Sequence, residues 1–393
     1  MTTPTPVNPN QPPPRTWRNG PVTLDELSAG LVWPTLLRTP VLALQPPRVL
    51  IGILVMLALW GIGRLLDWLL AFGGVEAIGS PLVWRLRDGW LDASEQLVSL
   101  HPAEALRFLG DATFGHVLGL LEYRPLTAGL AVLLLAPIFA IGSGAIARSV
   151  AVDLAVGTNL GVRDSLAFAL RRWASFLGAL IIPVVLIGVG IGALKVAGWL
   201  FLGLPYLNVL GALAYGLFLL VGLFTYALLI GFMLGQPMLA PAVAVEGTDA
   251  VDAIQRVYAY LLGRPGRALI YLFLAIAQGL IAIGLAAWVL NGAADLTSSM
   301  AGSFLSGEKS RALFEPGHQA GAAGAIVAFW QLCVALVLSG ILVSWHATAG
   351  TLIYLLLRRV CDEQDLREVW MPGVIPGTRA AETPTPARSG AMP

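Results

Sequence analysis

Long apolar runs recur along the chain and are separated by shorter polar segments. A helix needs about 20 mainly apolar residues to cross the roughly 30 Å hydrocarbon core of a membrane. Six segments reach this length: residues 49–71, 125–147, 174–197, 209–235, 268–290 and 321–345. The pattern predicts an all-α, polytopic membrane protein with about six transmembrane helices, in a membrane domain that covers residues 23–370.

The sixth apolar run continues past residue 345 to Leu357. As one helix its 37 residues would be about 55 Å long, much longer than the hydrocarbon core is thick. The run must therefore tilt, break near residues 346–350 or project into water. The sequence leaves these three alternatives open.

Amphipathic and polar segments flank the predicted spans. Residues 72–124 mix Leu and Trp with charged residues at helical spacing, which predicts an outer cap of short amphipathic helices. Thr23 and Glu26 have capping-box spacing and predict a surface helix that ends near Pro34. Residues 1–22 and 371–393 are polar and rich in proline, so we expect disordered tails there.

A repeat links two of the polar segments. Val150-Ala-Val-Asp153 is followed by a helix that Asp164 opens, and Val243-Ala-Val-Glu246 by a helix that Asp252 opens. We call these short amphipathic helices elbows. The repeating unit is a span, an interfacial elbow and a span, present twice in the same orientation. A third copy, closed through the first and sixth spans, would produce a pseudo-threefold bundle.

The second copy of the repeat carries a family resemblance. Its residues are Pro241-Ala-Val-Ala-Val-Glu246, Asp252-Ala-Ile-Gln-Arg256 and Tyr260-Leu-Leu-Gly263-Arg264. Over residues 125–290 the chain resembles the polytopic membrane domain attached to some glycerophosphodiester phosphodiesterases and related uncharacterised bacterial membrane-protein families. It departs from them at Val257-Tyr258, where a Ser-Trp pair is common. The resemblance implies about six spans with elbows. It implies no phosphodiesterase activity, because no phosphodiesterase domain is present.

Composition narrows the class of protein. Hydrophobic residues make up 57% of the chain and charged residues 12%, against about 25% charged in soluble domains. These values exclude a soluble enzyme, a disordered chain and a coiled coil. A net charge of +1 provides no basic face for nucleic acid. Cys333 and Cys361 are too few for a disulfide framework or a Cys-based zinc site.

The basic residues predict the orientation of the spans, because Arg and Lys near span ends stay on the cytoplasmic side. With both termini inside, 16 of the 24 basic residues are cytoplasmic and 6 are outside. All but two of the basic residues are Arg, a bias that suggests a GC-rich bacterial genome. We therefore expect a multi-pass protein of the bacterial inner membrane with cytoplasmic termini.

The spans offer little catalytic chemistry. The four histidines do not occur at metal-ligand spacing. Ser143 and His346 lie in apolar runs, but the Gly-x-Ser-Gly motif of rhomboid-type intramembrane proteases would need glycine at position 141, where Ile141 stands. Asp67 follows Arg64 by three residues, which predicts a helical ion pair. We expect no catalytic residue, no metal and no cofactor.

Small and polar residues inside the spans predict helix packing more readily than substrate binding. Gly188-x-x-x-Gly192 and Gly231-x-x-x-Gly235 predict close helix contacts. If the protein is a permease for a small neutral or lipid-like substrate, a polar cavity would be lined by Gln278, Gln331 and His346.

Arginines at the elbow–span junctions are the strongest functional lead. Anionic headgroups attract each cation at the membrane surface by about 1 kcal/mol. The hypothesis is an anionic-lipid site built from Arg171, Arg172, Arg256, Arg264 and Arg267. Its simpler alternative is that these residues serve topology and anchoring alone. We expect a non-catalytic scaffold or accessory protein of envelope or lipid organisation, whose partners are the bilayer, anionic lipids and other membrane proteins. The permease is the alternative.

Overall fold

The computed structural model describes residues 33–115, 119, 124–204, 206–315 and 317–371, and all regular secondary structure in this part of the chain is helical. The predicted all-α class is confirmed. The short helices are η1 (Trp33–Arg38), α2 (Thr39–Ala43), α4 (Gly79–Val98), α5 (Pro102–Gly110), η2 (Asp111–Gly115), α8 (Val162–Arg171), η3 (Gly198–Leu202), α10 (Asn208–Leu213), α12 (Ala250–Gly263) and α14 (Gly307–Phe314). The long helices are α3 (Pro46–Phe72), α7 (Pro125–Val156), α9 (Trp173–Ala197), α11 (Tyr215–Glu246), α13 (Pro265–Gly302) and α15 (Gly321–Asp362).

The six long helices correspond to the six predicted spans, and each is long and apolar enough to cross a membrane. The fourth differs most from its prediction: α11 begins at Tyr215, because residues 208–213 form the separate helix α10. The two predicted tails, apart from Met371, lie outside the described residues, and so does the predicted surface helix from Thr23 up to its last residues. The fold defines a polytopic helical membrane protein.

Helix α15 resolves the ambiguity of the sixth apolar run. It is one unbroken helix of 42 residues, about 63 Å long. Its second half, from Leu336 to Arg358, is largely buried between other helices. The run therefore neither breaks near residue 346 nor projects into water. The helix is longer than the bilayer is thick, and other helices of the protein surround its second half.

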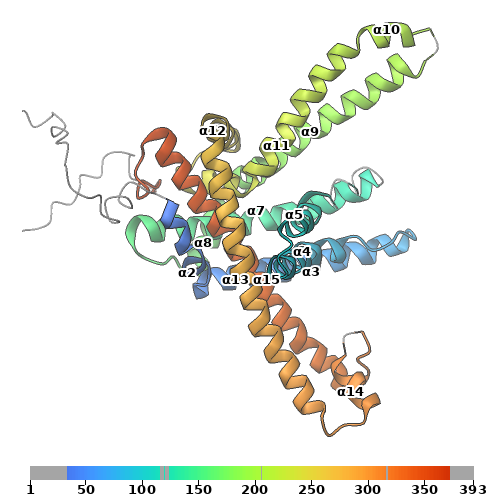
Figure 1. Ribbon diagram of the computed structural model, residues 1–393, viewed down its shortest axis with the longest axis vertical. Coiled ribbons are helices and arrows are strands. Elements are labelled where there is room, and N and C mark those ends of the chain that lie inside the picture. The colour runs from blue at the N-terminus through green and yellow to red at the C-terminus, as the bar shows by residue number, and fades with distance from the viewer. Residues whose placement is uncertain (1–32, 116–118, 120–123, 205, 316, 372–393) are drawn as a thin grey trace, which may run out of the picture.

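Three helices meet at the centre of the molecule and three hairpins diverge from there (Figure 1). Small residues allow the close approach at the centre: Gly350 of α15 lies against the carbonyl of Pro237 in α11, and Gly52 of α3 lies against the backbone of Gly340. We call the central part the hub, and it comprises residues 136–156 of α7, 235–246 of α11 and 336–362 of α15. The hairpins, called arms, are α3 with α7, α9 with α11, and α13 with α15.

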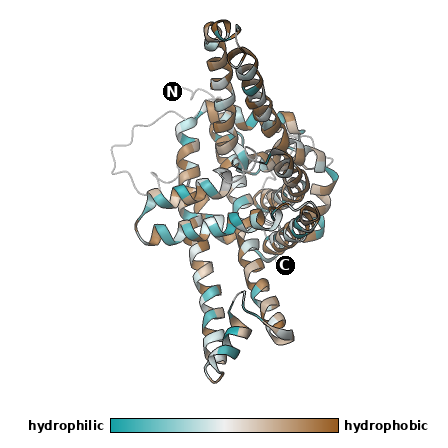
Figure 2. Ribbon diagram, turned by 90° about the vertical axis from the view of Figure 1, so that its right-hand side faces the viewer, coloured by the Kyte–Doolittle hydropathy of each residue, from teal (hydrophilic) through white to brown (hydrophobic). Residues whose placement is uncertain are grey.

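The arms carry large apolar side chains on their outer surfaces, and Figure 2 shows the α9–α11 arm, at the top, mostly in brown. On the α9–α11 arm, exposed apolar residues lie on both helices, among them Leu186, Val189, Leu220, Leu223 and Phe224. Exposed apolar surface of this extent is unfavourable in water and is typical of helices that contact lipid. The exposed surface of the arms is therefore consistent with contact with the hydrocarbon core, as are the length and composition of their helices.

A third elbow completes a third copy of the repeat, although the helix predicted for that elbow, from Thr23 to about Pro34, lies mostly outside the described residues. Each elbow contacts both helices of one arm: α8 contacts α7 and α3, α12 contacts α11 and α9, and η1–α2 contacts α15 and α13. The three hub helices also end alike. The residue after each helix adopts the left-handed conformation, at Gly157, Gly247 and Glu363. The third elbow is η1–α2, which begins about where the predicted surface helix was to end.

Helices α4 and α5 form an amphipathic hairpin between the arms, and hydrophilic residues gather on it in Figure 2. Asp67 of α3 fixes the start of α4, accepting hydrogen bonds from the backbone N–H groups of Ile78, Gly79 and Ser80 at 2.6–2.9 Å. The predicted Arg64–Asp67 ion pair is therefore wrong, because the carboxylate caps a helix instead. Near the middle of α4, Trp90 lies edge-on to Trp345 of α15, with ring centroids 4.9 Å apart. The predicted amphipathic helices are thus inserted between arms and do not simply cover their ends.

The two predicted glycine motifs have different outcomes. A Cβ atom at Gly231 or Gly235 would contact Tyr258 or Val257, so this motif packs closely against the elbow α12. A Cβ atom at Gly188 or Gly192 would have no heavy atom of another described element within 4 Å. That motif lies on the open α9–α11 arm, and its predicted contact is wrong because the neighbouring arms diverge from it.

Candidate functional site

Three arginines are buried where the hub helices meet the elbows: Arg48, Arg148 and Arg358 are each at most 4% exposed. A buried cation is costly unless anions or hydrogen-bond acceptors surround it. The partners of these three side chains therefore define the polar centre of the molecule.

Arg48 joins the start of α3 to the end of α7. Its guanidinium lies 2.7 Å from the carboxylate of Asp153 and donates to the Oγ of Ser149 at 3.1 Å. It also donates to the carbonyl of Leu42 in the third elbow at 2.7 Å. This ion pair fastens the third elbow to the first copy of the repeat.

Arg358 joins the end of α15 to the end of α11. Its guanidinium lies 2.9 Å from the carboxylate of Glu246. Tyr354, one turn earlier, donates its hydroxyl to the same carboxylate at 2.9 Å. Glu246 of the second copy of the repeat is therefore the acceptor for two side chains of α15, the hub helix of the third copy.

Elbow α12 contributes to the same network. Burial lowers the pKa of Arg256, but the carboxylates of Glu246 and Asp252 outweigh burial and raise that pKa. Tyr260 donates its hydroxyl to Asp362, and burial together with this carboxylate raises the pKa of Tyr260. Arg256, a predicted headgroup ligand, thus has acidic partners within the protein.

Arg148 has a different environment. Its guanidinium donates to the carbonyls of Ala244 at 3.1 Å and Trp370 at 2.7 Å and lies 4.6 Å from the ring centroid of Phe168. In the part of the chain that the structure describes, no carboxylate forms an ion pair with Arg148. Arg172 lies beside it, donates to the carbonyl of Gly247 and lies 4.5 Å from the ring centroid of Trp370.

Residues 363–371 follow α15 and fold back over the hub; we call them the strap. Arg358 donates to the carbonyls of Asp365 and Glu368 at 2.8 and 2.6 Å. The backbone N–H of Trp370 donates to the carbonyl of Val245 at 2.8 Å. The strap therefore covers the ends of α11 and α15 and is fastened by two of the buried arginines.

The five predicted headgroup arginines fall into two groups. Arg171, Arg264 and Arg267 are exposed and form no ion pair with a described residue. Arg172 and Arg256 are partly buried and bind groups of the protein itself. The structure thus places all five near the elbows but leaves only three free to contact a membrane surface.

The three polar residues predicted to line a cavity do not lie together. The side-chain amide of Gln278 donates to the carbonyl of Leu37 at 3.2 Å, which ties α13 to the third elbow. Gln331 accepts from Gln319 at 2.6 Å near α14. His346 lies in the hub, with its ring centroid 5.9 Å from that of Phe139.

A small cavity adjoins His346 and is bounded by Ser143, Gln236 and Pro237. Its volume of about 20 Å³ holds about one water molecule. The Oγ of Ser143 is buried and makes no hydrogen bond with a described residue. Ser143 and His346 therefore line one cavity but do not form the hydrogen-bonded pair that a serine hydrolase requires.

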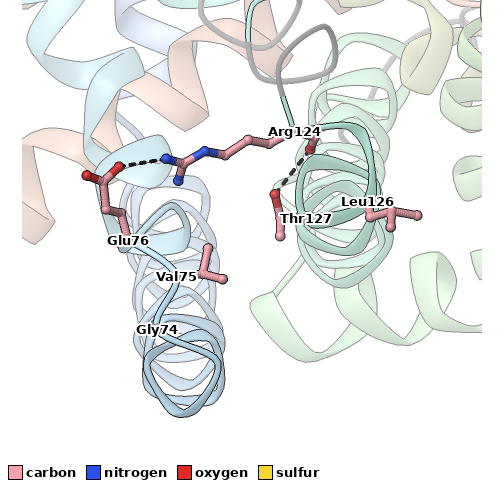
Figure 3. A pocket seen from close by; sticks show the side chains of 6 residues that line it. All are labelled: Gly74, Val75, Glu76, Arg124, Leu126 and Thr127. Atoms are coloured by element: carbon pink, nitrogen blue, oxygen red, sulfur yellow. Dashed lines mark hydrogen bonds and ion pairs between the residues drawn. The ribbon is translucent and has the colours of Figure 1, made fainter.

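A larger hollow of about 480 Å³ lies far from the hub, where α3 ends and α7 begins (Figure 3). Glu76 and Arg124 face each other across it and form an ion pair at 2.9 Å. The hollow is wide open, and its two charged groups neutralise each other. Among the described residues no group of three or more His, Cys, Asp and Glu side chains is placed to hold a metal ion.

The geometry defines a polytopic membrane protein with a threefold-repeated core and a cationic hub. No family model, no curated protein and no solved structure matches this chain. The resemblance to phosphodiesterase-linked membrane domains therefore stays a prediction.

Sequence reasoning missed Arg48, Arg148 and Arg358 as members of a site and treated them only as charges that set topology. One signal was present: Arg148 lies five residues before Asp153, inside the last turns of a helix that is otherwise apolar. An arginine at such a position requires a partner within the protein.

Proposed function

We propose that the protein is a non-catalytic membrane scaffold that holds anionic lipids at the hub side, and that this side faces the cytoplasm. One observation carries the proposal: each of the three elbows has, within it or directly after it, an exposed arginine within two residues of an exposed leucine. The pairs are Leu37 with Arg38, Leu170 with Arg171, and Leu262 with Arg264.

This pairing has a direct physical reading. An interfacial helix inserts apolar side chains among the acyl chains and keeps its cations at the level of the headgroups. The leucines are 55–80% exposed. In an elbow that faced water, leucine side chains would be expected to pack against other residues of the protein. Three arginines at about 1 kcal/mol each correspond to a more than hundredfold preference for an anionic surface at low salt.

The contents of the hub support a scaffold over the permease alternative. The hub cavity has room for about one water molecule, and Gln278 and Gln331 bond within the protein away from it. A permease for a neutral or lipid-like substrate needs a polar route between its two sides. The described hub instead has tightly packed small residues, such as Gly350 against Pro237.

The test compares two triple variants of the full chain, each purified in mild detergent from the same cells. Arg38→Gln, Arg171→Gln and Arg264→Gln remove the elbow cations; Arg85→Gln, Arg107→Gln and Arg311→Gln remove three exposed cations outside the hub. We expect the first set to lower co-purified phosphatidylglycerol and cardiolipin at least tenfold, and the second to leave them near the wild-type level. Equal lipid retention in the two sets would refute the proposal.

A further inference from the structure

The hub contains one buried arginine without an anion. Arg48 and Arg358 lie at 2.7 and 2.9 Å from carboxylates, whereas Arg148 is 4% exposed and its contacts with described residues are to carbonyls, aromatic rings and the Met371 thioether. An unpaired buried charge costs several kcal/mol. Arg48 and Arg358 offset that cost by forming ion pairs with carboxylates, and Arg148 does not.

A second cation makes the imbalance larger. Arg172 also lies near the Trp370 ring, with its guanidinium 4.5 Å from the ring centroid, and that of Arg148 lies 5.8 Å from it. Both cations also lie over the ring of Phe168, at 4.6 and 5.8 Å. The nearby end of α11 supplies a partial negative charge of about half a unit. Two cations and this partial charge leave a net charge of about +1.5.

We propose that Arg148 and Arg172 form a binding site for a phosphate-type anion, and that Trp370 of the strap covers this site in the present structure. Two guanidinium groups that lie near the same two aromatic rings can together bind the several oxygens of a phosphate monoester or diester. An anion there would take the place of the Trp370 carbonyl, which now accepts from Arg148 at 2.7 Å.

The contacts of the strap explain how it can yield. Arg358 holds the earlier part of the strap, whereas Trp370 itself is held by the bond from Arg148, its backbone bond to Val245 and ring contacts. An arginine–phosphate pair can be bidentate and adds the attraction between opposite charges, which a single bond from arginine to a neutral carbonyl lacks. Gly247 lies directly under the Trp370 ring, so the cover fits only because no Cβ atom is present there. The neutral Trp370 carbonyl therefore occupies the site, and a phosphate-type anion can displace it.

Two sources could supply the phosphate group, a free phosphate ion or a phospholipid headgroup. The full chain is placed in phosphatidylcholine nanodiscs, with Cys333 and Cys361 replaced by serine and Met371→Cys as the reporter. Met371 contacts Arg148, with its Sδ 3.4 Å from the guanidinium. The maleimide labelling rate of the new cysteine then measures release of the strap.

We expect added inorganic phosphate, or phosphatidylglycerol in the disc, to raise the labelling rate, and the probe that acts identifies the source. Arg172→Gln should weaken the response about tenfold, and so should Arg148→Gln if that variant folds. Arg163→Gln, an exposed arginine of the same elbow, is the matched control and should respond as the parent does. Trp370→Ala, with the cover removed, should bind the effective probe more tightly.

Three results would overturn the proposal, and the first two are a labelling rate that neither probe changes and a response that Arg172→Gln leaves intact. An equal response to potassium chloride would identify a general salt effect and would overturn it too. The proposal concerns a covered pocket and uses none of Arg38, Arg171 and Arg264. Failure of the proposed lipid contacts at Arg38, Arg171 and Arg264 can therefore be distinguished from failure of this covered site.

Discussion

Arg358 and Glu246 lie 112 positions apart in the chain and form an ion pair at 2.9 Å, which joins the ends of two hub helices. Removal of one partner would leave an unpaired buried charge, which typically costs about 3–5 kcal/mol. We expect Glu246→Ala to lower the unfolding midpoint in detergent markedly. Arg311→Gln breaks an exposed pair with Glu315 at 3.9 Å and should change stability by less than about 1 kcal/mol.

The same pair predicts a compensating double variant. Replacing both charges by apolar residues of similar size, as in Glu246→Leu with Arg358→Met, removes the unpaired charge and should recover much of the stability. Chemical unfolding in detergent measures this. If the double variant were as unstable as Glu246→Ala, the ion pair would not be the main contribution of these residues.

Gly350 lies so close to the carbonyl of Pro237 that a Cβ atom would overlap it. Gly350→Ala should therefore separate α15 from α11 and destabilise the hub by about 1–3 kcal/mol. Gly188→Ala is the control, since the new Cβ atom would have no heavy atom of another described element within 4 Å, and alanine is the better helix former. Thermal unfolding of both variants side by side decides whether the hub depends on this contact.

Asp67 accepts three backbone N–H groups at the start of α4. Loss of an N-terminal cap costs about 0.5–2 kcal/mol, so Asp67→Ala should loosen the α4–α5 hairpin. Hydrogen exchange should then increase in residues 79–98 and remain unchanged in the hub. Asp295→Ala removes an exposed carboxylate of α13 and should leave the exchange of α4 unchanged.

Tyr258 of the second elbow donates its hydroxyl to the carbonyl of Leu228 at 2.9 Å, and burial raises its pKa to about 12. A raised tyrosine pKa in the folded state means that its stabilising contribution is complete below pH 10 and is lost as the pH rises through 12. Tyr258→Phe should therefore reduce the fall in stability across this interval. An identical alkaline fall in both proteins would contradict the assignment.

The proposed orientation predicts which residues meet an external reagent. In a background without Cys333 and Cys361, Lys309→Cys should react with a membrane-impermeant maleimide in intact cells. Arg359→Cys should react only after permeabilisation. Both positions are exposed in the structure, so a reversed pattern would mean that the hub faces outward.

The sequence by itself determined the six spans, the first two elbows and the repeat that links them. These features follow from local patterns, because about 20 apolar residues must become a helix in a bilayer and amphipathic spacing defines a surface. The tertiary structure decided what depends on distant parts of the chain. It decided that α15 stays unbroken, since the hub buries it, and that α9 and α11 lie apart from the other arms. It also paired Arg48 with Asp153 and Arg358 with Glu246, and left Arg148 under the strap. No local pattern can specify these partners, because the energy of a buried charge depends on which groups the whole fold brings to it.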